Sequence, residues 1–403
     1  VEHWPLTVSG KTDRRALSAL PAEVVGASGQ GTAGPGARAA GNLLEQEIAR
    51  VMGEILQTVT PRPDEDFFAL GGSSLTALRL LTAVEAIAGH RANLADVFAA
   101  PTARTLAARL TPDAAGSRQS GPGAGTDFGD PLGAVFRLRA GDADQVPLVA
   151  LPPAGGLGWC WAGLLRHLPA DRPIYVIQVE GMNTGSPVEH PDLHSWAQRI
   201  AKLLEPVTGT TGVDLLGWSI GGMLAQELAV TLDAAGRTVR SVTLLDAYPA
   251  EQWAKQPLPD ERETLIGLLR MAGLEPAEGE ALDHDSVLAH LAADGSTFAG
   301  LQPQVISACM HNVRASARMI HASAHRTWQG DLRFFASADS LAQGFDPAGW
   351  AAHATGAIEV TTLPVHHGLM VREPAIAQVA QWLRHMAERP AELTGGLPFP
   401  VGR

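Results

Sequence analysis

The sequence predicts two unlike folds in one chain of 403 residues: a small all-α bundle of three or four helices, then a larger α/β domain. One segment repeats apolar residues at helical spacing, and another alternates buried-strand patterns with helices. Stretches rich in Gly and Ala, which favour a flexible coil, separate these segments. We therefore expect terminal segments at 1–20 and 389–403, linkers at 21–41 and 113–131, the bundle at 42–112 and the α/β domain at 132–388.

The bundle is indicated by apolar residues that recur every three or four positions, at Leu44, Ile48, Val51 and Ile55 and again at Leu80, Val84 and Ile87. A short helix is expected after Pro101, with Thr102 as its N-cap and Leu106 and Leu110 on its buried side. About seventy residues suffice for a small helical domain.

The larger domain is indicated by short apolar runs typical of buried strands, at Leu148–Leu151, Ile174–Val179, Val213–Leu216, Val242–Leu245, Leu332–Phe335 and Ile358–Leu363. Amphipathic helices are expected between several of them. This alternation predicts a mostly parallel sheet covered on both faces. The helix-rich stretch from Glu251 to Arg326 interrupts the alternation, and we interpret it as a lid insertion.

Composition excludes several classes of function. The net charge of −12 and the pI near 5.6 argue against a nucleic-acid or anionic-membrane partner. The chain has no apolar run of the ~20 residues that a membrane helix requires, and no secretory signal. Two cysteines, Cys160 and Cys309, form no disulfide framework, which fits a cytoplasmic protein. The chain begins with Val rather than Met, as expected of a piece of a longer protein.

The segment Gly217–Gly221 matches G-x-S-x-G, the motif that holds a nucleophilic serine on a sharp strand-to-helix turn. A strand is expected just before it and a helix just after it. This context favours Ser219 as the nucleophile of a hydrolase over a chance match on a loop.

A serine hydroxyl needs a base, and the base needs an acid that orients it. Two acids follow strands in the expected order, Asp246 and Asp339, and the residues alone leave both open. His366 and His367 follow the last strand, and we expect His367 to be the base. The histidines show no metal-ligand spacing, so no metal is predicted.

The oxyanion of such a reaction needs backbone N–H donors. We expect one from Ile220, directly after the nucleophile, and one from Ala154 in the loop that follows an early strand.

Ser73 and Ser74 follow Gly71-Gly72 and precede an apolar helix. Either serine would suit an N-cap. The Phe67-Phe68 anchor and the open glycine turn favour an exposed serine at a helix N-terminus, where the free N–H groups suit a phosphate.

These segments together resemble the C-terminal end of a nonribosomal peptide synthetase. Residues 5–17 resemble the closing motif of an adenylation domain, in which Lys11 would contact an acyl-adenylate. Residues 66–75 resemble a peptidyl carrier motif, which implies that Ser74 carries covalent 4′-phosphopantetheine. The residue before that serine is often His or Asp in the family, and here it is Ser73.

The α/β domain resembles a type I thioesterase of the α/β-hydrolase fold. In this family the acid follows the strand after the nucleophile helix, which implies Asp246. The histidine commonly stands three residues before an apolar residue, which His367 fits better than His366. The implied partners are a phosphopantetheinyl transferase, upstream adenylation and condensation domains, and a peptidyl thioester.

The resemblance implies an enzyme of secondary-metabolite biosynthesis, such as antibiotic biosynthesis, that moves a peptidyl chain from the thioester to Ser219. It then releases the chain by hydrolysis or macrocyclisation. Two alternatives remain: a proofreading hydrolase that clears misprimed acyl groups, and a carrier module with an inactive hydrolase fold.

Overall fold

The computed structural model describes residues 35–387 except 69, 71, 73, 89–95, 98–99, 111–131, 208–210, 256–257, 259, 272–273, 275, 278–279 and 293–302. The chain divides into two compact units, residues 1–42 and 43–403. Of the first unit, only the opening turns of helix α2 (Pro35–Leu56) are described. The expected adenylation tail at 1–20, the linker at 113–131 and the tail at 389–403 lie outside the described residues.

The bundle contains α2 together with α3 (Ser74–Ala88) and α5 (Ala103–Arg109). Its expected apolar faces pack into the core, with Ile48 and Leu80 fully buried and Leu44, Ile55 and Ile87 partly buried. Thr102 caps α5, since its hydroxyl accepts a hydrogen bond from the Thr105 N–H at 3.1 Å.

One expectation about the bundle is wrong. Helix α2 begins at Pro35, inside the stretch 21–41 that was expected to be a flexible linker. The reason is local propensity. Alanine, the best helix former, occupies positions 37, 39 and 40, and proline is tolerated in the first helical turn.

A seven-stranded sheet forms the larger domain, with strand order β1-β3-β2-β4-β5-β6-β7. The strands are β1 (Val135–Arg139), β2 (Leu148–Leu151), β3 (Ile174–Ile177), β4 (Val213–Trp218), β5 (Val239–Leu245), β6 (Leu332–Ser337) and β7 (Ile358–Leu363). Only β1, which the sequence patterns did not indicate, runs antiparallel to its neighbour β3. The mostly parallel sheet is therefore confirmed.

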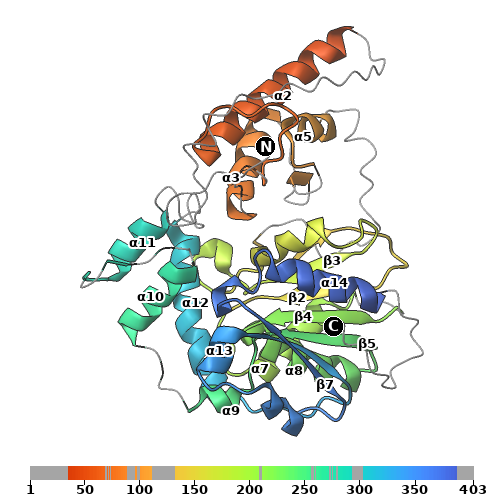
Figure 1. Ribbon diagram of the computed structural model, residues 1–403, viewed down its shortest axis with the longest axis vertical. Coiled ribbons are helices and arrows are strands. Elements are labelled where there is room, and N and C mark those ends of the chain that lie inside the picture. Colours follow the sequence, from red (N-terminus) through yellow and green to blue (C-terminus); the bar gives the residue numbers. More distant parts are fainter. Residues whose placement is uncertain are drawn as a thin grey trace, which may run out of the picture. The chain divides into compact units, whose positions relative to one another are not determined.

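Helices cover both faces of this sheet, as Figure 1 shows for α14 on one side and α7 and α8 on the other. Successive residues of a strand point to opposite faces. Leu148 and Ala150 accordingly pack with the helices η1 (Trp159–Arg166) and α14 (Ala375–Ala387), whereas Val149 and Leu151 pack with α7 (Leu193–Leu203) and α8 (Ile220–Ala234). Burial on both faces explains why the central strands β2, β3 and β4 read as continuous apolar runs, whereas β7 at the edge of the sheet is more exposed.

The described residues of the stretch between β5 and β6, which was expected to be a lid, form four helices: α9 (Ala250–Trp253), α10 (Glu261–Met271), α11 (His284–Ala292) and α12 (Pro303–Ala322). The last three share a small apolar cluster of their own, which includes Leu268, Leu291 and Ile306. Short helices η2 (Met182–Thr184), α13 (Ala338–Ala342), η3 (Pro347–Ala352) and η4 (His367–Leu369) complete the described elements.

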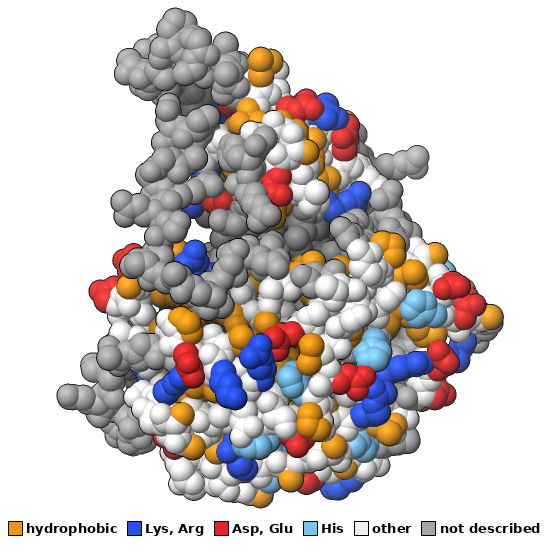
Figure 2. All heavy atoms as spheres, turned by 180° about the vertical axis from the view of Figure 1, so that it is seen from behind, with side chains coloured by type: hydrophobic (Ala, Val, Ile, Leu, Met, Phe, Trp, Pro, Cys, Tyr) orange, Lys and Arg blue, Asp and Glu red, His pale blue; other side chains and the backbone are white. Residues whose placement is uncertain are grey.

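The surface carries both signs of charge. On the face that Figure 2 shows, Lys and Arg side chains are interspersed with Asp and Glu rather than gathered into one basic patch. Among the described helices, none combines the length and the apolar character that crossing a bilayer requires.

Candidate active site

Ser219 lies on a tight turn between β4 and α8. Its backbone has φ 59° and ψ −131°, which is strained for a residue with a side chain. The flanking glycines make the turn possible: a Cβ on Gly217 would lie 2.0 Å from the Gly221 oxygen, and one on Gly221 would lie 2.5 Å from the Pro152 oxygen. The sequence motif therefore folds into the strand–turn–helix context that a nucleophilic serine requires.

Asp246 follows β5 at the same edge of the sheet and is fully buried. The structure brings it to His367, whose Nδ1 lies 2.7 Å from Asp246 Oδ2. The His367 ring is partly exposed and also packs against Trp218, the residue before Ser219, with 5.4 Å between ring centroids. Residues 121 positions apart thus meet beside the serine turn.

The Asp246 carboxylate accepts five hydrogen bonds, from His367 Nδ1, Ser337 N, Ser337 Oγ, Ser340 Oγ and Tyr248 Oη. Burial alone would raise the pKa of Asp246. The hydrogen bond and charge of His367, with the Ser340 and Ser337 donors, outweigh burial and hold the pKa below its usual value. The carboxylate therefore stays ionised and keeps the His367 proton on Nδ1, which leaves Nε2 free to accept a proton.

The other candidate pair lies apart from Asp246. Asp339 belongs to α13, and one of its carboxylate oxygens lies 3.4 Å from Nδ1 of His366, a side chain that is 78% exposed. The structure thus joins Asp246 with His367 and Asp339 with His366. Of the two acids that the sequence left open, Asp246 is therefore the one that lies beside His367.

The loop after β2 approaches the start of α8, as the close contact of Gly221 with Pro152 indicates. In this loop the Gly156 N–H donates to the Pro153 oxygen at 2.8 Å, which closes a turn around Ala154. Within the described residues, neither the Ala154 nor the Ile220 N–H donates a hydrogen bond. Backbone N–H groups near a reactive serine that lack a partner are what an oxyanion site needs.

In the bundle, Ser74 is the first residue of α3. The preceding turn is packed tightly, because a Cβ on Gly72 would lie 2.4 Å from the buried Phe67 ring, and the Gly72 N–H donates to the Phe67 oxygen. Ser74 therefore begins a helix shortly after a tightly packed glycine, and the first N–H groups of a helix suit a phosphate ester. Ser73 lies outside the described residues.

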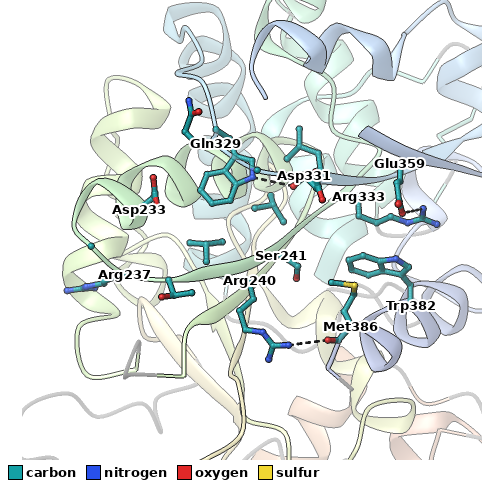
Figure 3. A pocket seen from close by; sticks show the side chains of 17 residues that line it. Asp233, Arg237, Arg240, Ser241, Gln329, Asp331, Arg333, Glu359, Trp382 and Met386 are labelled. Atoms are coloured by element: carbon teal, nitrogen blue, oxygen red, sulfur yellow. Dashed lines mark hydrogen bonds and ion pairs between the residues drawn. The ribbon is translucent and has the colours of Figure 1, made fainter. Parts of the chain in front are cut away.

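A pocket away from these residues is lined by the first residues of β5 and β6, together with Trp382 and Met386. Figure 3 shows it, with an ion pair between Arg333 and Glu359 and a hydrogen bond from Arg240 to the Met386 oxygen. Parallel strands begin at one edge and end at the other, so this pocket lies at the edge opposite Ser219 and Asp246.

Sequence reasoning missed the residues that support the site: Tyr248, Ser337 and Ser340 around Asp246, and Asn312 and Ser316 beside Ala154. Tyr248 had a weak signal, since it stands two residues after a candidate acid. The others had none, because single Ser and Asn residues are common at helix ends and on helix surfaces. In the described part of the chain, no group of three or more His, Cys, Asp or Glu side chains is placed to hold a metal ion.

Comparison with known families finds two matches. The model of the thioesterase domain matches residues 146–385, and the model of the phosphopantetheine attachment site matches residues 44–110. Over 389 residues the chain is 32% identical to a dimodular nonribosomal peptide synthase of Bacillus subtilis, a match that covers 95% of this chain and 15% of that protein. Over 345 residues it is 27% identical to enterobactin synthase component F of Escherichia coli, with coverage of 85% and 24%. The chain thus spans less than a quarter of the length of either relative.

Solved structures agree on the fold. A four-domain nonribosomal peptide synthetase superposes with a TM-score of 0.57 at 20% identity, covering 97% of this chain and 29% of that chain. The Vlm2 thioesterase domain gives 0.50 at 23% identity, covering 64% of this chain and 98% of that domain. The expected fold class, a helical carrier bundle and an α/β-hydrolase thioesterase, is confirmed. With a phosphopantetheine attachment domain at 44–110 and the serine turn at the edge of a largely parallel sheet, the chain belongs to the thioesterase domain family.

Proposed function

We propose that this chain is the carrier and thioesterase portion of a nonribosomal peptide synthetase, and that it releases a peptidyl chain by hydrolysis or macrocyclisation. One observation carries the proposal: the strained Ser219 turn and the Asp246–His367 hydrogen bond occur in the same chain as an attachment domain. A tethered carrier presents its cargo at high effective concentration, which favours its own thioesterase.

Ser74 is the proposed attachment residue for 4′-phosphopantetheine. The closely packed Gly72 and the helix that Ser74 begins fit a phosphate ester at this position. When bound, the group supplies a thiol that holds the peptidyl chain as a thioester. We expect a phosphopantetheinyl transferase to modify Ser74, upstream adenylation and condensation domains to supply the peptide, and a cytoplasmic location, which two unpaired cysteines fit.

In acyl transfer, Ser219 Oγ attacks the thioester carbonyl carbon while His367 Nε2 takes the hydroxyl proton. Asp246 holds the imidazole through Nδ1 and stabilises the imidazolium that forms. The Ala154 and Ile220 N–H groups stabilise the oxyanion. As the tetrahedral centre collapses, the carbon–sulfur bond breaks, His367 returns the proton to sulfur, and the acyl group remains as an ester on Ser219.

Release of the ester repeats these roles. His367 deprotonates water, or an amine or hydroxyl of the peptide itself, and the same N–H groups stabilise the second oxyanion. Water yields a linear acid and an internal nucleophile yields a ring. We propose that the insertion 251–326 acts as the lid that selects between them by admitting or excluding water.

Intact-protein mass spectrometry tests this sequence after a synthetic peptidyl-phosphopantetheine arm is loaded onto the carrier. Wild type should pass the peptide from Ser74 to Ser219 and release it, whereas Ser219→Ala should leave it on the arm. Undiminished release by Ser219→Ala would contradict the mechanism. Failure to load Ser74 would contradict the carrier assignment.

The acid is tested by a matched pair of variants. Asp246→Asn should lower kcat by about 10⁴-fold, because the amide stabilises the wrong His367 tautomer and not the imidazolium. Asp339→Asn removes the same charge from a partly exposed carboxylate that pairs with His366 instead of His367, and it should have little effect. The reverse ranking would move the acid to Asp339. A fluorophosphonate that fails to label Ser219 in wild type would instead support an inactive hydrolase fold, and preferential release of short acyl groups would support a proofreading hydrolase.

A further inference from the structure

Helix α12, the last helix of the insertion, contacts the backbone that carries a proposed oxyanion donor. The Ala154 carbonyl oxygen accepts hydrogen bonds from Asn312 Nδ2 at 2.8 Å and from Ser316 Oγ at 3.2 Å. Both side chains are almost fully buried, with 3% and 1% exposure. They stand four residues apart and therefore on the same face of the helix. Two buried donors thus converge on a single carbonyl.

The fit between Asn312 and the loop is close. Gly156 has φ +80°, and a Cβ at this position would lie 2.8 Å from Asn312 Nδ2. The amide thus lies directly against loop backbone that has no side chain. Replacing either residue by a larger one would separate the helix from the loop.

Three other carbonyls in or next to this loop are bound within the α/β framework. The Leu151 oxygen accepts from Trp161 Nε1, the Pro153 oxygen from the Gly156 N–H, and the Gly156 oxygen from the Val179 N–H. Ala154 is different because its carbonyl is held by the insertion. The insertion is therefore connected to the loop residue whose N–H is the proposed oxyanion donor.

The hydrogen bonds matter because Ala154 occupies a turn. Pro153 and Gly156 close this turn, and the peptide between its two central residues can flip without disturbing the strands. A flip would turn the Ala154 oxygen away from Asn312 and Ser316, and each buried donor that loses this acceptor costs about 1–3 kcal/mol. The pair therefore locks the orientation of the peptide between Ala154 and Gly155. By anchoring the Ala154 main chain to α12, it also fixes the position from which the Ala154 N–H, part of the preceding peptide, is presented.

We propose that Asn312 and Ser316 are positioning residues that hold the oxyanion turn in its reactive geometry and couple it to the helical insertion. This inference rests on the proposed acyl-transfer function. A displacement of α12 by a bound peptide would then change the rate of the chemical step as well as access to the site. Neither side chain touches the reacting atoms in this scheme.

The experiment uses the full chain, with a fluorophosphonate probe and a p-nitrophenyl acyl ester as reporters of Ser219. Asn312→Ala should reduce both the labelling rate and kcat about 10-fold, and Asn312→Ala with Ser316→Ala about 100-fold, with little change in KM. These losses approach those caused by removing an oxyanion donor outright. Ser316→Ala alone, a change that favours the helix, should reduce kcat about 3-fold. Arg318→Ala is the control, because this exposed side chain on the same helix pairs with Glu189 and should leave both rates unchanged.

A pH signature separates positioning from packing. Asn312→Asp keeps the shape of the side chain but can donate to the Ala154 oxygen only when protonated. The ratio of its kcat to that of Asn312→Ala should therefore rise as pH falls, while the His367 contribution cancels in the ratio. Wild-type rates in Ser316→Ala and Asn312→Ala, or a pH-independent ratio, would overturn the inference. Absence of wild-type labelling at Ser219 would overturn the proposed function instead.

Discussion

The stability of the thioesterase domain should depend on pH through His325, a half-buried residue shortly after α12. The Ala250 N–H donates to His325 Nε2 at 3.1 Å, so Nε2 must carry the lone pair. The other nitrogen, Nδ1, therefore carries the proton and donates to Gln226 Oε1 at 3.1 Å. Gln226 is fixed in turn, because its Nε2 donates to the Arg326 oxygen. Protonation of His325 would break the bond to Ala250, at the start of the insertion.

Enclosure of the ring away from water, with the nearby His353 as a smaller influence, lowers the pKa of His325 from 6.5 to about 3. Below the unfolded pKa of about 6.5 the unfolded chain binds a proton that the folded chain does not, so stability is lost as pH falls from there toward 3. At 1.36 kcal/mol for each pH unit, the 1.5 units between 6.5 and 5 amount to ~2 kcal/mol.

The test compares wild type with His325→Gln, which keeps an acceptor for Ala250 and a donor for Gln226 but does not titrate. Urea unfolding followed by tryptophan fluorescence reports the thioesterase domain, since eight of the nine tryptophans lie between positions 159 and 382 and residues 44–110 contain none. Between pH 8 and pH 5, wild type should lose ~2 kcal/mol more free energy of unfolding than the variant. Equal losses would refute this account, because the other titrating groups are common to both proteins.

Three further changes have defined outcomes. Arg172→Leu should lower the free energy of unfolding measured in urea by about 3–5 kcal/mol, because it leaves the buried Asp214 carboxylate without its cation. A loss below about 1 kcal/mol would contradict this reasoning. Ser340→Ala removes a donor that keeps the pKa of Asp246 low. As pH falls, the variant should therefore lose activity at a higher pH than wild type does. An unchanged pH–rate profile would rule out this role. Gly222→Ala would place a new Cβ 2.3 Å from the Cβ of Ala247. This clash should lower the free energy of unfolding by about 1–3 kcal/mol and should also lower kcat. A melting temperature equal to that of wild type would contradict the tight packing.

Local sequence patterns were sufficient for most of the architecture. Apolar runs predicted six of the seven strands. The signal was clearest for the central strands β2 and β4, because strands buried on both faces have no polar alternation to confuse with a helix. The glycine-flanked Ser219 was predictable for a similar reason, since the turn imposes its residue types locally. Strand β1 was missed although its residues alternate in burial, because its two arginines and the Gly-rich stretch before it conceal the pattern.

The order of residues along the chain was also enough to propose a nucleophilic serine, an acid and a basic histidine. It was not enough to choose between Asp246 and Asp339 as the acid. The choice depends on which strand ends lie side by side. Asp246 is held by Ser337 and Ser340 from the end of the neighbouring strand β6 and the helix after it, more than 90 positions away. Asp339 turns outward to His366 instead.

By itself, the sequence determined the positions of most helices and strands and the sharp turn that places a serine. These properties follow from propensity, periodicity and motif over a few neighbouring residues. The order of an attachment domain before a hydrolase domain was implied by the resemblance of two local motifs to known families. Only the tertiary structure decided that Asp246 meets His367 and that Asn312 and Ser316 reach the Ala154 carbonyl, 158 and 162 positions away. Such contacts depend on sheet order and helix packing, and a local pattern contains no information about either.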